Sequence, residues 1–140
     1  MRLCQLLKMN LKKNKNSSPR IKVIQRLYNS LMNPDAIIDY PKSQYKNFIK
    51  DVVTGTLERT ELIEEKIISH LQTDINLSKT DKLLKIILYA AIYELMFKIN
   101  TPRKVIINEY LIASEHFLEK IQIGYLNAIL DKIAKVLRKE

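Results

Sequence analysis

The segment from Leu83 to Phe97 constrains the fold most, because it is apolar around almost its whole circumference when read as a helix. Such a helix is stable only when other helices enclose it, so this segment is predicted to form the centre of a hydrophobic core. The chain has two glycines and four prolines in 140 residues, which are too few turn signals for a many-stranded β fold. The sequence therefore predicts one all-α domain with its own core.

Apolar residues at helical spacing predict three helices before this segment. Ser18 and Pro19 form an N-cap and a first helical residue, followed by an inward stripe of Ile21, Ile24, Leu27, Tyr28 and Leu31. A second helix is expected from about Ser43, with its inward residues at Phe48, Val52, Val53 and Leu57. A third helix, or a continuation of the second, has its apolar positions at Leu62, Ile63, Ile67, Ile68 and Leu71. Gly55 either allows close helix packing or marks a break.

Two more helices are predicted after the central segment. Thr101 and Pro102 repeat the cap-plus-proline signal and start a helix that runs through Phe117. Gly124 is expected to open the last helix, which turns its basic residues outward at Lys132, Lys135, Arg138 and Lys139. The pattern thus predicts about six or seven helices.

The positive charge is concentrated at the N-terminal end. The net charge is +9, and residues 1–34 contain eight basic residues and no acidic one. Because residues 12–17 are polar and aperiodic, residues 1–17 are predicted to be a flexible basic leader to a domain of residues 18–140, and Met9 is an alternative start. A nearly neutral body with one basic arm is typical of a protein that binds a polyanion at a defined place. The alternatives are a solvated tail and, less well matched by its lysines and asparagines, a mitochondrial transit peptide.

The sequence contains few of the patterns that accompany catalysis. Its glycines stand far apart, so no loop can cradle a phosphate, and the isolated His70 and His116 do not suggest a metal site. The acidic residues within or beside apolar helices are interpreted as structural carboxylates rather than catalytic acids: Asp81, Glu94, Glu109 and Asp131. We expect a protein that is not an enzyme and needs no cofactor. The single Cys4 suits a reducing compartment, and no apolar run is long enough to span a membrane, so a cytoplasmic location is expected.

Three ordered motifs in the second half resemble the NusB transcription antitermination family. They are Tyr93-Glu94-Leu95, then Pro102 followed by Val105-Ile106-Ile107-Asn108-Glu109, then Tyr125-Leu126-Asn127-Ala128-Ile129-Leu130-Asp131-Lys132. Near the N-terminus, Arg20 followed by Gln25-Arg26-Leu27-Tyr28 is similar to the family's arginine-rich start and its Gln-x-Leu-Tyr. The chain departs from the family pattern where Tyr89 replaces an arginine and Ala128 a glycine, and its basic leader uses lysines in place of adjacent arginines.

The resemblance implies a compact bundle of two packed three-helix subdomains. It also implies binding to boxA-type single-stranded RNA of nascent ribosomal RNA transcripts, in a heterodimer with the small-subunit ribosomal protein NusE and within the transcription elongation complex. The helices around residues 82–104 are the expected partner face. The alternatives are a domain related to the NusB-like part of ribosomal RNA cytosine methyltransferases and a helical module that binds only protein.

Eight residues are candidates for RNA contact. Cations hold the backbone of single-stranded RNA, and aromatic rings stack on its bases. The basic candidates are Lys12, Lys13, Lys15, Arg20 and Lys22. Gln25 either reads a base edge or only solvates its helix, and Tyr28 is either an RNA contact or a core residue. Tyr125 is the favoured aromatic contact, because it is expected in the first turn of the last helix, where unpaired N–H groups attract phosphate.

Overall fold

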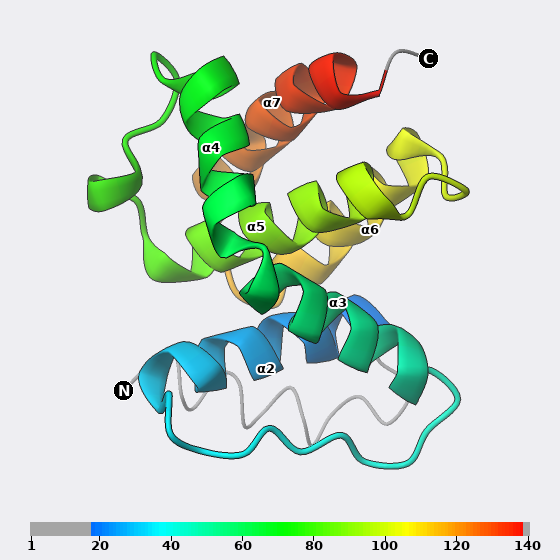
Figure 1. The fold of residues 1–140 in the computed structure, drawn as a ribbon. Helices are drawn as coiled ribbons and strands as arrows, with labels where there is room; N and C mark the ends of the chain where they lie inside the picture. The colour runs from blue at the N-terminus through cyan, green and yellow to red at the C-terminus, as the bar shows by residue number, and fades with distance from the viewer. Residues whose placement is uncertain (1–17, 139–140) are drawn as a thin grey trace.

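The structure, a computed structural model, describes residues 18–138 (Figure 1). This range contains six α-helices, one short 3₁₀ helix and no strand, so the predicted all-α fold is confirmed. The elements are α2 (Pro19–Met32), α3 (Lys46–Glu58), α4 (Thr60–Leu71), η1 (Leu77–Lys79), α5 (Lys82–Phe97), α6 (Arg103–Ser114) and α7 (Lys120–Leu137). None of these helices combines the length and the apolar content that crossing a membrane requires.

Helix α5 forms the centre of the molecule, as its composition predicts. It buries twelve of its sixteen residues and packs against each of the other five α-helices. Helices α2 and α3 lie together below it in Figure 1, while α4 extends upward beside α7. Helix α4 thus packs on two helices of the second half of the chain, α5 and α7. Helix α5 contacts the helices that precede it as well as those that follow it.

The predicted start of α2 is confirmed, and two other predicted boundaries are wrong. The Ser18 hydroxyl accepts a hydrogen bond from the Arg20 N–H at 3.2 Å, which satisfies one of the unpaired donors of the first turn. Helix α6 begins at Arg103 without a side-chain cap and ends at Ser114, three residues before the predicted end. Helix α7 begins at Lys120, where the Gln122 side chain accepts from the Glu119 N–H at 3.0 Å, so Gly124 does not open it.

Gly55 permits close packing between α3 and α5. A Cβ atom built at this position would collide with the ring of Tyr93, which lies directly against the α3 backbone. The break between α3 and α4 comes four residues later, at Arg59. Of the two interpretations of Gly55, close packing is therefore the correct one.

Arg138 turns inward, contrary to the prediction that it faces solvent. Its side chain is buried and donates hydrogen bonds to backbone carbonyls in the last turn of α5 and just beyond it, including Leu95 at 2.7 Å and Lys98 at 2.8 Å. The last residue that the structure describes thus caps the C-terminal end of the central helix, where a positive charge is favourable.

Candidate nucleic-acid interface

Arg20 lies in the hydrophobic core and not on the RNA-facing surface where the sequence analysis placed it. Its Nε and Nη2 donate to the two carboxylate oxygens of Glu94 at 3.0 and 2.7 Å. Its guanidinium also lies 5.0 Å from the ring centroid of Phe48 and 5.5 Å from that of Tyr110. Burial alone lowers the pKa of Arg20, but the hydrogen bond and charge of Glu94 outweigh burial and raise it. We therefore no longer assign Arg20 to RNA.

Gln25 and Tyr28 are also buried, on the inward side of α2. A buried amide does not solvate its helix, so that interpretation of Gln25 is wrong, and its side chain has no surface from which to read a base. Tyr28 was predicted to be either an RNA contact or a core residue, and its buried position agrees with the core residue. Helix α2 thus directs three of its four candidates into the protein.

The remaining basic candidates are Lys22 and the leader lysines. Lys22 is half-buried on α2, two residues beyond the buried Arg20. Lys12, Lys13 and Lys15 fall outside the described residues. Their assignment to RNA stays a prediction from charge.

Tyr125 is the candidate with an accessible ring. Its side chain is 41% exposed on α7, and its hydroxyl donates to the backbone carbonyl of Asp74 at 2.6 Å. Burial, followed by the charge of Asp74, raises the pKa of Tyr125, so the hydroxyl keeps its proton and remains a donor. Because α7 begins at Lys120, Tyr125 lies in the second turn, and the N–H groups of the first turn are not beside it. The ring is therefore held at the surface, without the expected phosphate site next to it.

The residues next to Tyr125 on the surface of α7 are small and exposed. A Cβ atom built at Gly124 would meet nothing within 4 Å, and Ala128, one turn further along, is exposed. Lys132 lies two turns beyond Tyr125 and donates to the Asp74 carboxylate at 2.7 Å. One residue of the loop after α4 thus holds both the tyrosine and the lysine through its carbonyl and its carboxylate.

An apolar groove of about 380 Å³ lies where the ends of α2 and α3 meet the start of α5. Its rim includes Leu31 and Leu57, which their helical stripes predict to be inward but which are 48% and 42% exposed. The Thr56 hydroxyl in the groove wall is buried and has no hydrogen-bond partner among the described residues. Lys82 and Lys85 line the end of the groove that belongs to α5.

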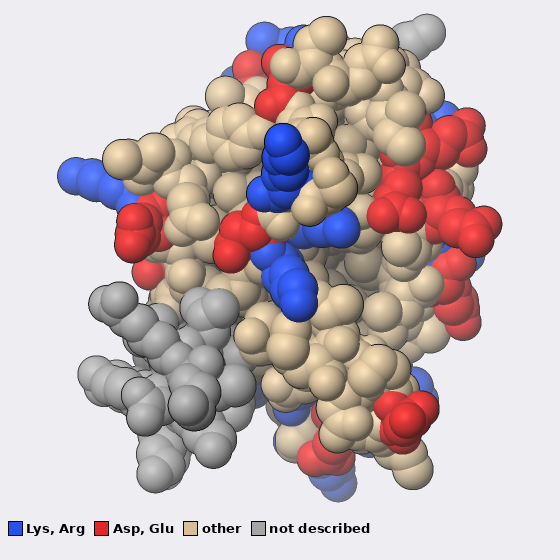
Figure 2. Space-filling view, turned by 90° about the vertical axis from the view of Figure 1, so that its left-hand side faces the viewer, with Lys and Arg blue, Asp and Glu red and all other residues tan. Residues whose placement is uncertain are grey.

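Figure 2 shows the side of the molecule that lies to the left in Figure 1, where η1 and the first turns of α5 are. Basic side chains stand near the middle of this face, and acidic ones gather along its right-hand edge.

Tyr89, which also lines the apolar groove, donates through its hydroxyl to the Glu64 carboxylate at 2.6 Å. Burial and this carboxylate raise the pKa of Tyr89 far above its ordinary value.

The sequence contained signals for several of these placements. Arg20 precedes Ile24 by four residues and Leu27 by seven, so helical spacing puts it on the buried face of α2. A carboxylate at Glu94, inside a helix that the core encloses, requires a cationic or hydrogen-bonding partner. The structural role predicted for Glu94 is confirmed, and so is a structural role for Asp81, which caps α5 by accepting from the Leu84 N–H at 3.2 Å. The sequence contains no comparable signal for the groove. Helical spacing identifies the apolar face of each helix, but it does not show which residues of that face other parts of the chain bury.

His70 and His116 are half-buried. Across residues 18–138, no three His, Cys, Asp or Glu side chains come together in a group that could hold a metal ion.

The chain is similar to known proteins over most of its length. A family model described as the NusB family matches residues 5–135. The transcription antitermination protein NusB of Rickettsia akari is 34% identical, over 90% of this chain and 95% of that protein. The protein of the same name from Rickettsia bellii is 36% identical, over 86% of this chain and 90% of that protein.

The fold is similar to a solved structure as well. The structure of T. maritima NusB matches with a TM-score of 0.72 and 23% identity, over 86% of this chain and 92% of that one. The two proteins share an all-α fold. The chain belongs to the NusB family, as its three ordered motifs indicated.

Proposed function

We propose that this chain is a transcription antitermination factor that binds boxA-type single-stranded RNA of nascent ribosomal RNA transcripts together with NusE. It acts in the cytoplasm, within the transcription elongation complex, and without catalysing a reaction. Membership of the NusB family and the naming of its relatives as transcription antitermination proteins support this proposal.

The observation that carries the proposal is the exposed and anchored ring of Tyr125. The hydrogen bond from its hydroxyl to the Asp74 carbonyl fixes the ring on the surface of α7. The adjacent Gly124 has no side chain, which leaves room for a nucleotide to approach the helix. A fixed ring loses little conformational entropy when a base stacks on it, so this position is suited to holding one base of a single strand.

Electrostatic attraction supplements stacking in the proposed interface. Lys22 and the leader lysines Lys12, Lys13 and Lys15 are proposed to neutralise backbone phosphates. If three to five phosphates are neutralised, the log–log dependence of RNA affinity on salt concentration has a slope of about −2 to −3.5 for a single strand. A slope near zero would remove the electrostatic part of the proposal.

Two substitutions at Tyr125 test the stacking contact. Tyr125→Ala removes the ring and is expected to weaken binding of boxA-type RNA by about 1–3 kcal/mol, the usual contribution of one aromatic–base stack. Tyr125→Phe keeps the ring and removes only the hydroxyl, so it is expected to retain most of the affinity. Fluorescence anisotropy with labelled RNA measures both, and circular dichroism checks that each variant is folded. If both variants bind RNA as the parent chain does, Tyr125 is not a contact.

The apolar groove is the proposed contact face for NusE. Its residues on α5, which include Lys82, Lys85 and Tyr89, fall within the region where the family resemblance places the protein partner. The exposed ends of the α2 and α3 stripes give this face apolar surface that another protein can bury. The partner extends the surface along the RNA and adds the specificity that a few cations and one ring lack.

One substitution and a matched control test the partner face. Leu57→Asp on the groove rim should weaken NusE binding at least tenfold, because it places a charge in the apolar contact. Ile68→Asp introduces the same charge at an exposed isoleucine of α4 outside the groove, and should leave NusE binding unchanged. Equal effects of the two changes would place the partner elsewhere.

Calorimetry of the parent chain with NusE, with and without boxA-type RNA, tests cooperation between the two ligands. Thermodynamic linkage requires RNA to tighten the protein pair by the same factor by which NusE tightens RNA binding. We expect enhancement of several-fold or more in both directions. Independent binding would contradict the cooperative module.

A further inference from the structure

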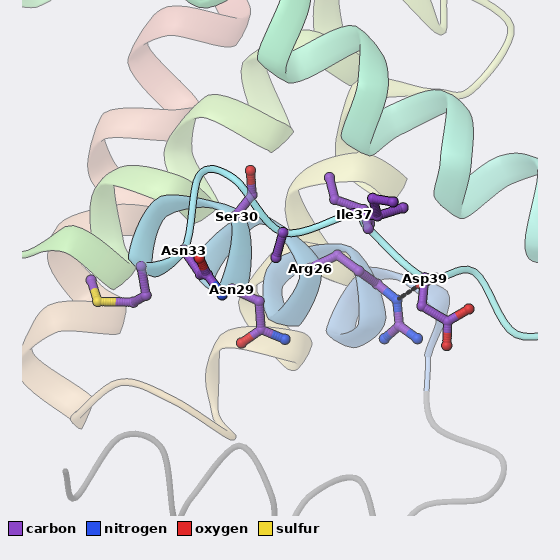
Figure 3. A pocket seen from close by; sticks show the side chains of 9 residues that line it. Arg26, Asn29, Ser30, Asn33, Ile37 and Asp39 are labelled. Atoms are coloured by element: carbon purple, nitrogen blue, oxygen red, sulfur yellow. Dashed lines mark hydrogen bonds between the residues drawn. The ribbon is translucent and has the colours of Figure 1, made fainter.

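A second hollow lies on α2, beside the loop that connects it to α3, and the proposed function does not use it. It has a volume of about 440 Å³ and lies between the second half of α2 and residues 36–39. Figure 3 shows Arg26 and Asn29 coming from α2, Asn33 from the residue that ends it, and Ile37 and Asp39 from the loop that runs alongside it. Arg26 ties the two walls together, since its Nε donates to the Asp39 carbonyl at 3.1 Å.

The hollow combines exposed apolar side chains with an acidic and a basic residue. Ile37 is 95% exposed, and the exposed Met32 also lines the hollow. The loop contributes one carboxylate to the lining, that of Asp39, and the lining also includes the cation Arg26. Asp35 precedes the lining residues of the loop, and neither it nor Asp39 forms an ion pair with a described residue. A segment that fits here therefore presents apolar residues to Ile37 and Met32, and a basic residue can lie on the side of the loop carboxylates.

One segment of the chain itself has this composition. Residues 1–17 contain five basic residues and no acidic one. Within them Leu3, Leu6, Leu7 and Leu11 are spaced i, i+3, i+4 and i+8, which predicts one apolar face of a short helix. An isolated helix of this length is marginal in water, so such a segment needs a surface to pack on. The polar and aperiodic residues that led to the prediction of a flexible leader are residues 12–17, which follow this segment.

We propose that residues 3–11 dock into the hollow on α2, with their leucines against Ile37 and Met32 and with Lys8, their one basic residue, toward Asp39. The length of the chain permits it. Asn29 lies eleven residues beyond Ser18, which is about 16 Å along a helix, and residues 12–17 span up to about 20 Å when extended. The leader can thus fold back along α2 and reach the hollow.

Docking gives the basic leader a defined course. Residues 12–17 then run along the outside of α2, which fixes Lys12, Lys13 and Lys15 near Lys22. This inference concerns a contact within the chain and holds whether or not the protein binds RNA. Its test therefore measures position and stability, and the RNA experiments above are separate from it.

The single cysteine provides the first test in the full chain. A nitroxide attached to Cys4 should broaden the amide NMR signals of residues 29–39 and leave those around Gly124 sharp. Ile37→Ser should reduce that broadening several-fold, whereas Ile121→Ser, at an isoleucine of α7 that is 85% exposed, should not. Unbroadened signals in residues 29–39 would overturn the proposal. So would broadening that persists when the label and the observed nuclei are placed on different molecules, because docking would then occur between two copies.

A double-mutant cycle provides the second test. Leu7→Ser and Ile37→Ser should each lower the thermal midpoint by about 2–4 °C, a shift that corresponds to the loss of one modest apolar contact. The two changes together should lower it no further than either one alone, because both break the same contact. Leu7→Ser combined with Ile121→Ser should give additive shifts. Additive effects of Leu7→Ser and Ile37→Ser would show that the two residues do not touch, and the proposal would fail.

Discussion

The start of α2 and the second turn of α7 both carry residues that match family motifs and that their charge or ring makes candidates for RNA contact, and the structure places them in opposite environments. At the start of α2, Arg20 is enclosed by a carboxylate and two rings. On α7, the ring of Tyr125 lies at the surface, tied only by its hydroxyl. Matching a family motif therefore does not by itself separate a residue that builds the domain from one that meets a ligand.

The difference follows from what each residue can pair with. A guanidinium that precedes an apolar stripe by one helical turn is carried inward by the helix, and it remains charged there because Glu94 is within hydrogen-bond distance. Tyr125 faces a loop backbone in place of a side-chain partner, so one edge of its ring is bound while the rest remains open. Four substitutions test this contrast, and their expected effects on stability decrease in order.

Breaking the buried pair should have the largest effect. Arg20→Ala leaves the Glu94 carboxylate without its cation in the core, which typically costs about 3–5 kcal/mol of unfolding free energy. Urea denaturation measures the loss. Replacing both partners, with Arg20→Met and Glu94→Leu, should recover much of it, because no buried charge then remains. If Arg20→Ala instead leaves stability unchanged and weakens RNA binding, the assignment of Arg20 to the core is wrong in solution.

The next largest effect is expected where α3 meets α5. Gly55→Ala puts a methyl group into the position of the Tyr93 ring, so that the buried ring or the helices must shift, at a cost of about 1–3 kcal/mol. Gly55→Ala combined with Tyr93→Ala should cost less than the sum of the two single changes, because the collision disappears. Thermal unfolding of the four chains measures this coupling, and strict additivity would show that the two residues are not in contact.

Part of the fold and of the candidate interface can be predicted from the sequence alone. The enclosed α5 was predictable because a helix that is apolar on all sides has few alternatives. The boundaries of α6 and α7 were not, since Pro102 and Gly124 occur in positions compatible with several starts, and Lys120 begins its helix without a strong signal. The burial of Arg20 was predictable from spacing, whereas the exposure of Leu31 and Leu57 depends on where neighbouring helices end.

A smaller effect of opposite sign is expected at the other glycine. Gly124 is within α7, where glycine is less favourable than alanine by about 0.5–1 kcal/mol, and its missing side chain would touch nothing. Gly124→Ala should therefore raise the unfolding free energy by roughly that amount. The same methyl group narrows the approach to the neighbouring Tyr125 ring, so RNA affinity should fall while stability rises. A gain in stability with unchanged RNA affinity would mean that no nucleotide passes close to this position.

The smallest effect on stability is expected where Lys132 pairs with Asp74 beside Tyr125. Exposed ion pairs contribute about 0–1 kcal/mol, so Asp74→Asn should hardly change the unfolding free energy, and the backbone carbonyl that holds Tyr125 remains. The substitution removes a negative charge and leaves the Lys132 ammonium without its carboxylate partner, next to the proposed stacking site. RNA affinity should rise, and the salt slope should become steeper by about 0.7, the contribution of one additional phosphate contact. Asp131→Asn is the matched control, because it frees Lys135 on the same helix from a similar exposed pair. If the two variants strengthen RNA binding equally, the gain reflects net charge alone, and the strand does not pass between Tyr125 and Lys132.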